Sequence, residues 1–507
     1  MQANATHQTG RARCDGALVH YERHSPEQTT LYRLVQQHAA SFIAHTEAST
    51  GSELPGFIKD EFDAFLECGI LAHGFLRLRC GDCGHDKLLA FSCKRRGFCP
   101  SCGARRMSQT AAHLVDHVIP QVPVRQWVLS LPIPLRLLLA AQPELVTPVL
   151  QVVQRVVARH LLDGVGLKGE EGHGGAVTLI QRFGSAANLN IHLHCLVLDG
   201  VYRCGADGVP VFVEAVAPSD DELHALLHTV IARLMKMLTR RGVLVQDMGQ
   251  TWLAEPDASA DGDEARTLRP LQAAAITYRI AFGPRAGQKV LTLRGAMARQ
   301  GMARELLCSD IDGFSLHAAV RVEAYDRKRL EQLCRYITRP ALADERVQVN
   351  AAGQVELKLK TPWRDGTTHL VMSPLEFMQR LAALVPRPRL HLIRFHGVLA
   401  PNAKLRSLVV PQGPPADKEP ATDAAATAEC ENETARARPG RISWARLLKR
   451  VFDIDMQRCP NCGAGELKII AAILERAVIE KILAHLGLDP QPPPKGRARE
   501  AGLHFAA

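Results

Sequence analysis

The stretch Leu189-Asn190-Ile191-His192-Leu193-His194-Cys195-Leu196-Val197-Leu198-Asp199-Gly200 decides how the centre of this chain folds. It is rich in apolar and β-branched residues and ends in an Asp-Gly turn, a pattern that predicts a β-strand. Side chains alternate between the two faces of a strand, so Asn190, His192 and His194 share one face. Two imidazoles on one face can bind the same metal cation. A structural zinc site or a hydrogen-bonded histidine pair would fit the same pattern.

The segment just before this strand supplies a partner for it. Residues 176–185, Ala-Val-Thr-Leu-Ile-Gln-Arg-Phe-Gly-Ser, form a second predicted strand, and the short gap between the two favours antiparallel pairing. Mg²⁺ and Mn²⁺ prefer several oxygen ligands, which makes Gln181 the candidate third ligand beside His192 and His194. An ordinary polar strand residue is the alternative for Gln181.

Other strands are predicted at residues 124–131, 273–282 and 314–322, with helices between and after them. A run of strands interrupted and followed by helices indicates the α+β class. We therefore expect a central antiparallel sheet with helices, preceded by a small metal-binding domain.

The metal-binding domain is predicted from its cysteines, which number fourteen in the whole chain. Cys80, Cys83, Cys99 and Cys102 have the C-x2-C-x15-C-x2-C spacing of a tetrahedral structural zinc site. Cys93 lies between the two pairs and could replace one ligand. Near the C-terminus, Cys459 and Cys462 form half of a second site, whose partners come from elsewhere in the chain if it binds zinc at all.

The overall charge favours a nucleic-acid partner. The chain carries 62 Lys+Arg against 52 Asp+Glu, a net charge of +10, and basic side chains displace counterions from phosphates. Arginines cluster around the zinc motif, in the stretch 326–340 and in the basic segment 386–397. Solvated charged faces are the alternative explanation for these clusters. The candidate DNA-binding residues are Arg95, Arg96, Arg105, Arg106, Arg335, Arg339 and Arg394.

Membrane association is not expected. Residues 1–15 are polar and lack the apolar core of a secretory signal, and the most apolar segment, 127–141, is interrupted by Pro132, Pro134 and Arg136. We expect a cytoplasmic protein, in which cysteines serve metal binding and burial better than disulfides.

At 507 residues the chain should form several units. The expected order is a loosely ordered N-terminus (1–29), a zinc-binding DNA-recognition domain (30–110), a catalytic domain (111–345), a C-terminal part of the same region (346–410), a disordered linker rich in Pro, Ala, Glu and Thr (411–440), and a small C-terminal module with a single C-x2-C (441–507).

A helix is predicted from Asp326 to just before Pro340, and it carries Tyr336 at the edge of its apolar stripe. A half-buried packing tyrosine is the ordinary reading of such a residue. The alternative is a nucleophile: a divalent cation on His192 and His194 would polarise a phosphate oxygen, and the phenol would attack phosphorus to leave a 5′-phosphotyrosine. The bond energy kept in this adduct would allow the strand to be rejoined.

These motifs together resemble a known family. Gln181-Arg-Phe-Gly-Ser and the His-Leu-His strand resemble rolling-circle transposases of the HUH nuclease superfamily, in particular the IS91 insertion-sequence family and its ISCR relatives. The cysteine motif is similar to the zinc-binding domain of those transposases. The resemblance extends through Cys334-Arg-Tyr-Ile-Thr-Arg-Pro340, Trp363-Arg-Asp-Gly-Thr-Thr-His369 and His391-Leu-Ile-Arg-Phe-His-Gly397.

The resemblance implies an HUH nuclease domain over residues 111–345 and a transposase activity that nicks and transfers single DNA strands. It implies structural Zn²⁺, catalytic Mg²⁺ or Mn²⁺, transposon ends bound as single-stranded or hairpin DNA, a target DNA, and a homo-oligomer as one option. Founding members of the family place two tyrosines four residues apart. Here those positions are Gln332 and Pro340, so Tyr336 stands alone, as in the ISCR branch.

Several other functions share part of this sequence pattern. His391-Leu-Ile-Arg394 matches a tyrosine-recombinase motif, but no tyrosine follows Tyr336 to act as its nucleophile. A metal-dependent hydrolase would need a further acidic ligand, and Asp199 is better explained by the turn. A replication initiator or relaxase would share the nuclease chemistry, and a non-catalytic zinc-dependent DNA-binding protein would share the zinc motif.

Overall fold

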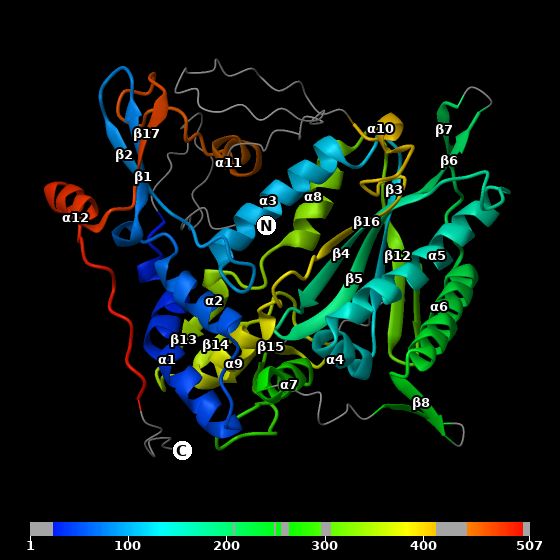
Figure 1. Cartoon of the computed structure of the whole chain (residues 1–507), viewed down its shortest axis with the longest axis horizontal. Coiled ribbons are helices and arrows are strands. Elements are labelled where there is room, and N and C mark those ends of the chain that lie inside the picture. Colours follow the sequence, from blue (N-terminus) through cyan, green and yellow to red (C-terminus); the bar gives the residue numbers. More distant parts are fainter. Residues whose placement is uncertain are drawn as a thin grey trace, which may run out of the picture.

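The computed structural model describes residues 24–205, 208–247, 250–254, 263–295, 306–411 and 444–499. Helices and antiparallel sheets alternate along these ranges, which confirms the α+β class (Figure 1). The loosely ordered N-terminus expected over 1–29 lies outside the described residues up to position 23. The linker expected over 411–440 lies outside them except for residue 411.

A six-stranded sheet forms the centre of the molecule, and every neighbouring pair in it is antiparallel. The predicted His-Leu-His strand lies inside the sheet, between the strand that precedes it and the strand at 124–130. In spatial order the strands are β11 (Cys308–Ile311), β12 (Phe314–Val322), β3 (Val124–Ser130), β5 (Leu189–Leu198), β4 (Gly175–Phe183) and β16 (Ile393–Gly397).

Helices cover both faces of this sheet (Figure 1). On one face, α3 (Pro100–His117) and α8 (Arg327–Thr338) pack their apolar residues against Leu179 of β4 and Leu196 of β5. The other face packs against α4 (Ile133–Ala141), α5 (Val146–Gly164) and α6 (Asp220–Arg240). Because Leu196 has the same strand parity as the two histidines, the histidines lie on the α3–α8 face.

A second layer of structure packs at one end of the central sheet. The helices α1 (Thr30–Thr50), α2 (Gly56–Glu67), α7 (Asp263–Ile276) and α9 (Pro374–Leu384) share a continuous apolar core with the central sheet. A four-stranded sheet lies beside α1, in the order β10 (Leu291–Arg294), β15 (Thr367–Met372), β14 (Val355–Lys358) and β13 (Val347–Val349).

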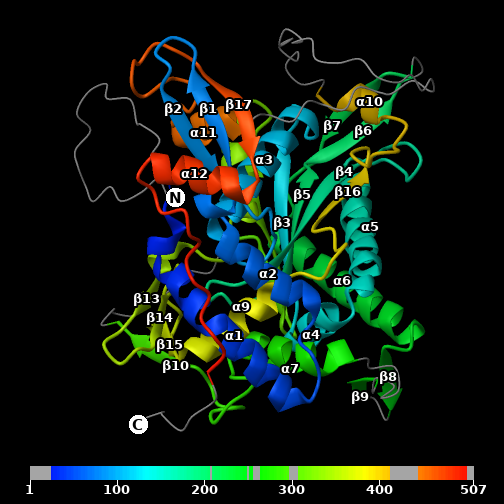
Figure 2. The same cartoon turned by 60° about the vertical axis from the view of Figure 1, so that its left-hand side comes forward.

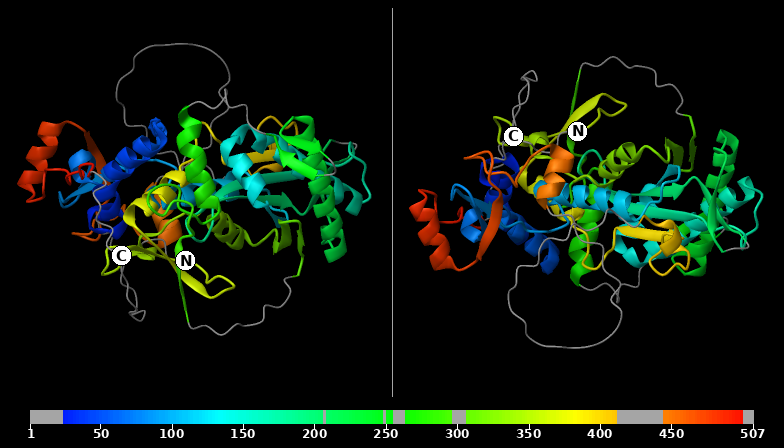
Figure 3. Two further views of the ribbon diagram at one scale, coloured as in Figure 1. Left: turned by 90° about the horizontal axis from the view of Figure 1, so that it is seen from below. Right: turned by 90° about the horizontal axis from the view of Figure 1, so that it is seen from above.

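The C-terminal segment packs on the N-terminal zinc motif. Its strand β17 (Leu467–Ile473) pairs with β1 (Phe75–Cys80), which also pairs with β2 (Asp86–Ala90). The helices α11 (Trp444–Phe452) and α12 (Arg476–His485) flank β17, and the last described residues run along α1, where the Gln36 amide donates to the Pro494 carbonyl (Figure 2). Figure 3 shows this three-stranded sheet at the opposite end of the molecule from α6.

Smaller elements complete the described structure. They are the hairpins β6 (Gly200–Cys204) with β7 (Pro210–Glu214) and β8 (Leu244–Asp247) with β9 (Gln250–Leu253), the helix α10 (Arg406–Val409), and the 3-10 turns Pro26–Gln28, Leu71–His73, Pro143–Leu145 and Asp344–Arg346.

Two features of the fold differ from the sequence pattern. The strand predicted at residues 273–282 is wrong, because its alanine-rich first part ends helix α7, where alanine is the best helix former. The helix α3 runs from Pro100 to His117 and so crosses the boundary expected at residue 110. The zinc motif and the central sheet are therefore joined by a continuous helix.

Among the described helices, none alone is long and apolar enough to cross a membrane. One bent pair, Ile133–Ala141 with Pro143–Gly164, meets the length and composition criteria together, with an angle of 109° between its halves.

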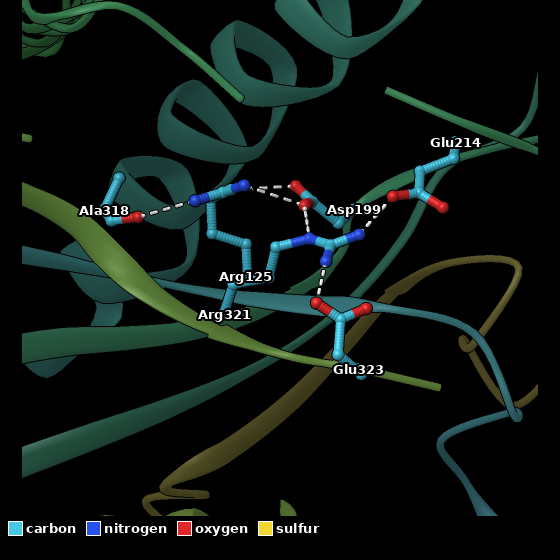
Figure 4. A network of polar contacts seen from close by, with 6 residues as sticks. All are labelled: Arg125, Asp199, Glu214, Ala318, Arg321 and Glu323. Carbon is cyan, nitrogen blue, oxygen red and sulfur yellow. Dashed lines mark hydrogen bonds and ion pairs between the residues drawn. The ribbon is translucent and has the colours of Figure 1, made fainter. Parts of the chain in front are cut away.

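Asp199, at the end of β5, is buried in an ion-pair network that joins three strands (Figure 4). Its carboxylate accepts hydrogen bonds from Nε and Nη2 of Arg125 on β3, both at 2.9 Å, and from Nε of Arg321 on β12 at 2.7 Å. The side chains of Asp199 and Arg125 are only 2% and 4% exposed. Arg321 also pairs with Glu214 and Glu323. The turn assigned to Asp199 from the sequence is thus also a buried link between β3, β5 and β12.

Replacing Asp199 with asparagine should lower the free energy of unfolding by about 3–5 kcal/mol, because Arg125 would stay buried without its counter-charge. Denaturant unfolding of the full chain, followed by circular dichroism, measures this. The control is Glu323→Gln on the exposed side of the same network, which should change stability by less than about 1 kcal/mol. Equal, small losses in both variants would contradict the role given to Asp199.

Candidate active site

The two histidines of β5 lie between polar side chains of the neighbouring strands. His192 is paired with Ser130 of β3 and with Gln181 of β4. His194 lies directly beyond it on the same face, and the centroids of the two rings are 4.8 Å apart. The structure therefore brings together His192, His194 and Gln181, the three residues expected to hold a catalytic cation.

A backbone contact sets the tautomer of His192. Its Nδ1 lies 3.0 Å from the carbonyl oxygen of Asn190, and a carbonyl can only accept. Nδ1 must therefore carry the proton, which leaves the lone pair of Nε2 free for a metal. A partner that fixes the other ring nitrogen in this way is what metal-binding histidines usually have.

His194 is held by Gln126 of β3, whose Nε2 lies 2.7 Å from Nδ1 of the ring. An amide nitrogen can only donate, so in this arrangement Nδ1 accepts and the neutral ring carries its proton on Nε2. The Nε2 atom of His194 is buried and has no hydrogen-bond partner among the described residues. Burial lowers the pKa of His192 to about 4 and that of His194 to about 3, and the positive charge of Arg339 contributes in the same direction. Both imidazoles are therefore neutral at pH 7, the form that binds a metal. A divalent cation at Nε2 of His194 requires the Gln126 amide to be turned so that its Oε1 accepts from a proton on Nδ1, which frees the Nε2 lone pair.

Gln181 ties this face of the sheet to helix α8. Its Nε2 donates to the Ile337 carbonyl at 2.6 Å, and Ile337 itself is buried in the apolar core between α3, α8 and the sheet. Ile337 directly follows Tyr336, so the residue beside His192 is bonded to the turn of helix that carries the candidate nucleophile.

Tyr336 is partly exposed, at 40%, and lies between two cations. The guanidinium carbon of Arg339 is 4.5 Å and the ammonium of Lys360 is 4.3 Å from the centre of its ring. Arg339 also donates to the Tyr336 carbonyl at 2.7 Å and lies over the ring of Phe183. Burial, followed by the charges of Arg339 and Arg346, lowers the pKa of Lys360 to about 8. This is a strongly positive setting for a phenol.

Four of the candidate DNA-binding arginines line one cavity of about 430 Å³. It lies between the start of α3, the end of β4, the chain after α8 and the segment before β16, and Gln181 and Phe183 also line it. Three of the arginines already donate to backbone carbonyls: Arg96 to Leu390 and Arg387, Arg106 to Lys94 and Arg95, and Arg339 to Tyr336. The four arginines are Arg95, Arg96, Arg106 and Arg339.

The other three arginines lie elsewhere. Arg105 stacks on Trp444 of α11, with 5.3 Å between its guanidinium carbon and the ring centre. Arg335 lies on α8, one residue before Tyr336. Arg394 is paired with Thr178 across β16 and β4, and its Nε is buried without a hydrogen-bond partner among the described residues.

The single zinc site expected from Cys80, Cys83, Cys99 and Cys102 is not formed, because the structure divides these residues between two clusters. The first cysteine cluster joins Cys99 and Cys102, at the start of α3, to Cys93 and to Cys68 at the end of α2. Its sulfurs are 3.3–3.7 Å apart where they touch. Cys93 was expected as a substitute ligand and belongs to this cluster.

The second cysteine cluster joins Cys80, the last residue of β1, and Cys83 of the following turn to Cys459 and Cys462 of the C-terminal segment. The pairing of β1 with β17 brings these segments together and takes the first C-x2-C away from the second. Each cluster holds its four sulfur atoms within 4.8 Å of one another, an arrangement suited to zinc.

Three contributors were not identified from the sequence. Cys68 belongs to no C-x2-C motif. Two tetrahedral sites need eight cysteines, and this requirement alone could have indicated that another ligand was missing. Gln126 contacts His194 and Lys360 contacts Tyr336, each from a distant segment of the chain. No local sequence pattern predicts either contact.

Two family models match the chain. The family described as "Transposase zinc-binding domain" matches residues 34–131, which include the first cysteine cluster. The family described as "Putative transposase" matches residues 175–406, which include Gln181, His192, His194 and Tyr336. No curated protein and no solved structure matches the chain.

The buried histidines should make the protein sensitive to acid. The unfolded chain protonates His194 near pH 6.5 and the folded chain only near pH 3, so stability falls as the pH drops between these values, by up to about 1.4 kcal/mol per pH unit. His194→Gln should remove this contribution. Unfolding free energies of the variant and the wild type, compared from pH 6.5 to about 4, should converge as the pH falls. Parallel curves would contradict the buried neutral state.

Proposed function

The chain belongs to the IS91-type transposases, and we propose that it cuts and transfers single DNA strands through Tyr336 in a rolling-circle mode of transposition. The observation that carries this proposal is the constellation on one face of the central sheet. Two neutral histidines, of which His192 has an unprotonated Nε2, lie beside Gln181, which is bonded to the residue after Tyr336.

His192 and His194 would hold a catalytic Mg²⁺ or Mn²⁺ through Nε2, with Gln181 as the candidate third ligand. For His194 this needs the Gln126 amide turned so that its Oε1 accepts from Nδ1. When bound, such an ion polarises a phosphate oxygen and stabilises the charge that develops in the transition state. The Nε2 of Gln181 donates a hydrogen bond to the Ile337 carbonyl, so its Oε1 is the atom available as a metal ligand.

In the cleavage step, the phenolic oxygen of Tyr336 attacks phosphorus and the bond from phosphorus to the 3′-oxygen breaks. The phenolic proton goes to solvent, and the leaving 3′-oxygen takes up a proton to become a hydroxyl. The 5′-phosphate stays esterified to Tyr336, so a 3′-hydroxyl can later reverse the step and join the strand without another energy source.

Arg339 and Lys360 supply positive charge where the phosphate must lie. Both cations contact the Tyr336 ring, and a charge beside the attacked phosphate stabilises the transition state more than the ground state. The cavity lined by Arg95, Arg96 and Arg106 begins at the same residue, Arg339, and offers a path for the DNA backbone from the nucleophile to the zinc-binding domain.

The chain offers one tyrosine on α8, because the positions one turn away are Gln332 and Pro340. A scheme in which two tyrosines of one chain alternate as acceptors is therefore closed to it. Either a single covalent adduct is resolved by the free 3′-hydroxyl, or a second copy supplies the second tyrosine.

Tyr336→Phe should abolish the covalent adduct with DNA and leave DNA binding within about 2-fold of the wild type, since only the attacking oxygen is removed. Single-stranded oligonucleotides from the flanks of the gene, labelled on the 3′ side of the expected nick, are incubated with Mg²⁺ or Mn²⁺ and run on a denaturing protein gel. A labelled band at protein mass is expected for the wild type only.

The matched control is Tyr325→Phe, because Tyr325 lies just before α8, is 85% exposed and should not react. It should form the adduct at the wild-type level. The double variant His192→Ala with His194→Ala should lose the adduct together with the response to metal. Adduct formation by Tyr336→Phe would overturn the assignment of the nucleophile.

Lys360→Gln should slow adduct formation by about 10-fold or more, because it removes a charge beside the nucleophile and leaves the strands that carry the candidate metal ligands unchanged. Lys358→Gln, an exposed lysine at the end of β14, is the matched control and should keep the wild-type rate. Single-turnover rates of adduct formation distinguish the two. Equal rates in both variants would show that Lys360 takes no part.

A further inference from the structure

The second cysteine cluster draws its sulfurs from two parts of the chain that are 376 residues apart at Cys83 and Cys459. Neither family model reaches its C-terminal half, since the matches end at residues 131 and 406. The zinc-binding domain described by the first model therefore contains the whole first cysteine cluster but only half of the second.

The two halves of the second cysteine cluster have the same local structure. Each is a C-x2-C-G turn, in which the glycine amide donates to the carbonyl of the first cysteine: Gly84 to Cys80 at 3.2 Å and Gly463 to Cys459 at 2.9 Å. Both glycines have a positive φ, +71° and +69°, which residues with a side chain rarely adopt. Turns of this kind present two sulfurs to one side, as in zinc knuckles and ribbons.

The C-terminal turn is shaped closely around the sulfur of Cys80. Any side chain at Gly465 would place its Cβ 2.3 Å from that sulfur, so only glycine fits. The Gly465 amide donates to the Cys462 sulfur at 3.3 Å, and the Cys459 amide donates to the Gly465 carbonyl at 2.8 Å. These contacts orient the sulfurs of Cys459 and Cys462 toward those of Cys80 and Cys83.

The spacing of the sulfurs fits a tetrahedral metal. Zinc–thiolate bonds of about 2.3 Å place neighbouring sulfurs about 3.8 Å apart. The Cys80 and Cys462 sulfurs are 3.8 Å apart and those of Cys83 and Cys459 are 3.5 Å apart. Both distances are far longer than the roughly 2.05 Å of a disulfide.

We propose that the second cysteine cluster binds one zinc ion, and that this zinc holds the C-terminal segment against the zinc-binding domain and against helix α8, which carries Tyr336. The three strands β2, β1 and β17 and the two turns then form a zinc ribbon assembled from opposite ends of the chain. The inference concerns metal binding and assembly, and it stands whether or not the proposed strand transfer is correct.

The C-terminal segment contacts helix α8 through α11. Arg450 of α11 donates to Glu331 of α8 at 2.7 Å and to Asp116 of α3 at 3.0 Å. Trp444, at the start of α11, receives the guanidinium of Arg105 on its ring. Glu331 precedes Tyr336 by five residues, so loss of the zinc should loosen a contact on the helix that carries the nucleophile.

Zinc content of the purified full-length protein tests the proposal directly. The wild type should hold two zinc ions per chain, and the double variant Cys459→Ser with Cys462→Ser should hold one. Cys204→Ser, which removes an exposed cysteine outside both clusters, should hold two. One zinc in the wild type, or two in the double variant, would overturn the proposal.

If the double variant does not accumulate, the wild type itself can be tested with Co²⁺ in place of Zn²⁺. Two tetrahedral four-sulfur sites should each contribute the visible absorption of thiolate-bound cobalt, so the signal should rise until two equivalents are bound. Saturation at one equivalent would overturn the proposal.

Hydrogen exchange separates a fastening role from metal binding alone. In the double variant, amides of Leu467–Ile473 and Trp444–Phe452 should exchange at least 10-fold faster, while those of β4 and β5 should not change. Unchanged exchange over these two segments, with one zinc lost, would overturn the fastening role.

Discussion

The register of β5 between β3 and β4 is the constraint on which the rest of the site depends. It places His192 opposite Gln181 and His194 beside Gln126, and it turns both imidazoles toward helix α8. A slip of one residue would exchange the two faces of the strand and put the histidines into the core under α5. The ion pairs of Asp199 oppose such a slip, because they bind the end of β5 to both β3 and β12.

Helix α8 is the second element that gathers contacts from distant segments. Gln181 of β4 donates to it, Arg450 of α11 donates to Glu331 on it, and α3 packs along it. Just beyond the helix, Pro340 lies so close to Gly103 that a Cβ there would be 2.6 Å from it. Gly103 follows Cys102 of the first cysteine cluster. Both cysteine clusters are therefore connected by direct contacts to the helix that carries Tyr336.

Periodicity accounts for what could be predicted from sequence. The alternation of a strand puts His192 and His194 on one face without knowledge of the fold, whereas the position of Gln181 beside them depends on the register between β4 and β5. Helical spacing gives α8 its buried stripe of Leu330, Cys334 and Ile337. The grouping of the cysteines could not be predicted, because it depends on the pairing of β1 with β17 across most of the chain. The spacing in the sequence grouped Cys80 and Cys83 with Cys99 and Cys102, whereas in the folded chain Cys80 and Cys83 lie beside Cys459 and Cys462. Lys360 was missed for the same reason.

Three of the buried polar atoms without partners lie around the candidate site. Buried polar groups are nearly always hydrogen-bonded, yet His194 Nε2, Asn190 Oδ1 and Arg182 Nε have no partner among the described residues. All three lie on β4 or β5, at or near the histidine pair. Each costs free energy in the folded chain unless a ligand satisfies it. A cation at the histidines and a phosphate near Arg182 would satisfy these groups, so binding should stabilise the sheet that positions them.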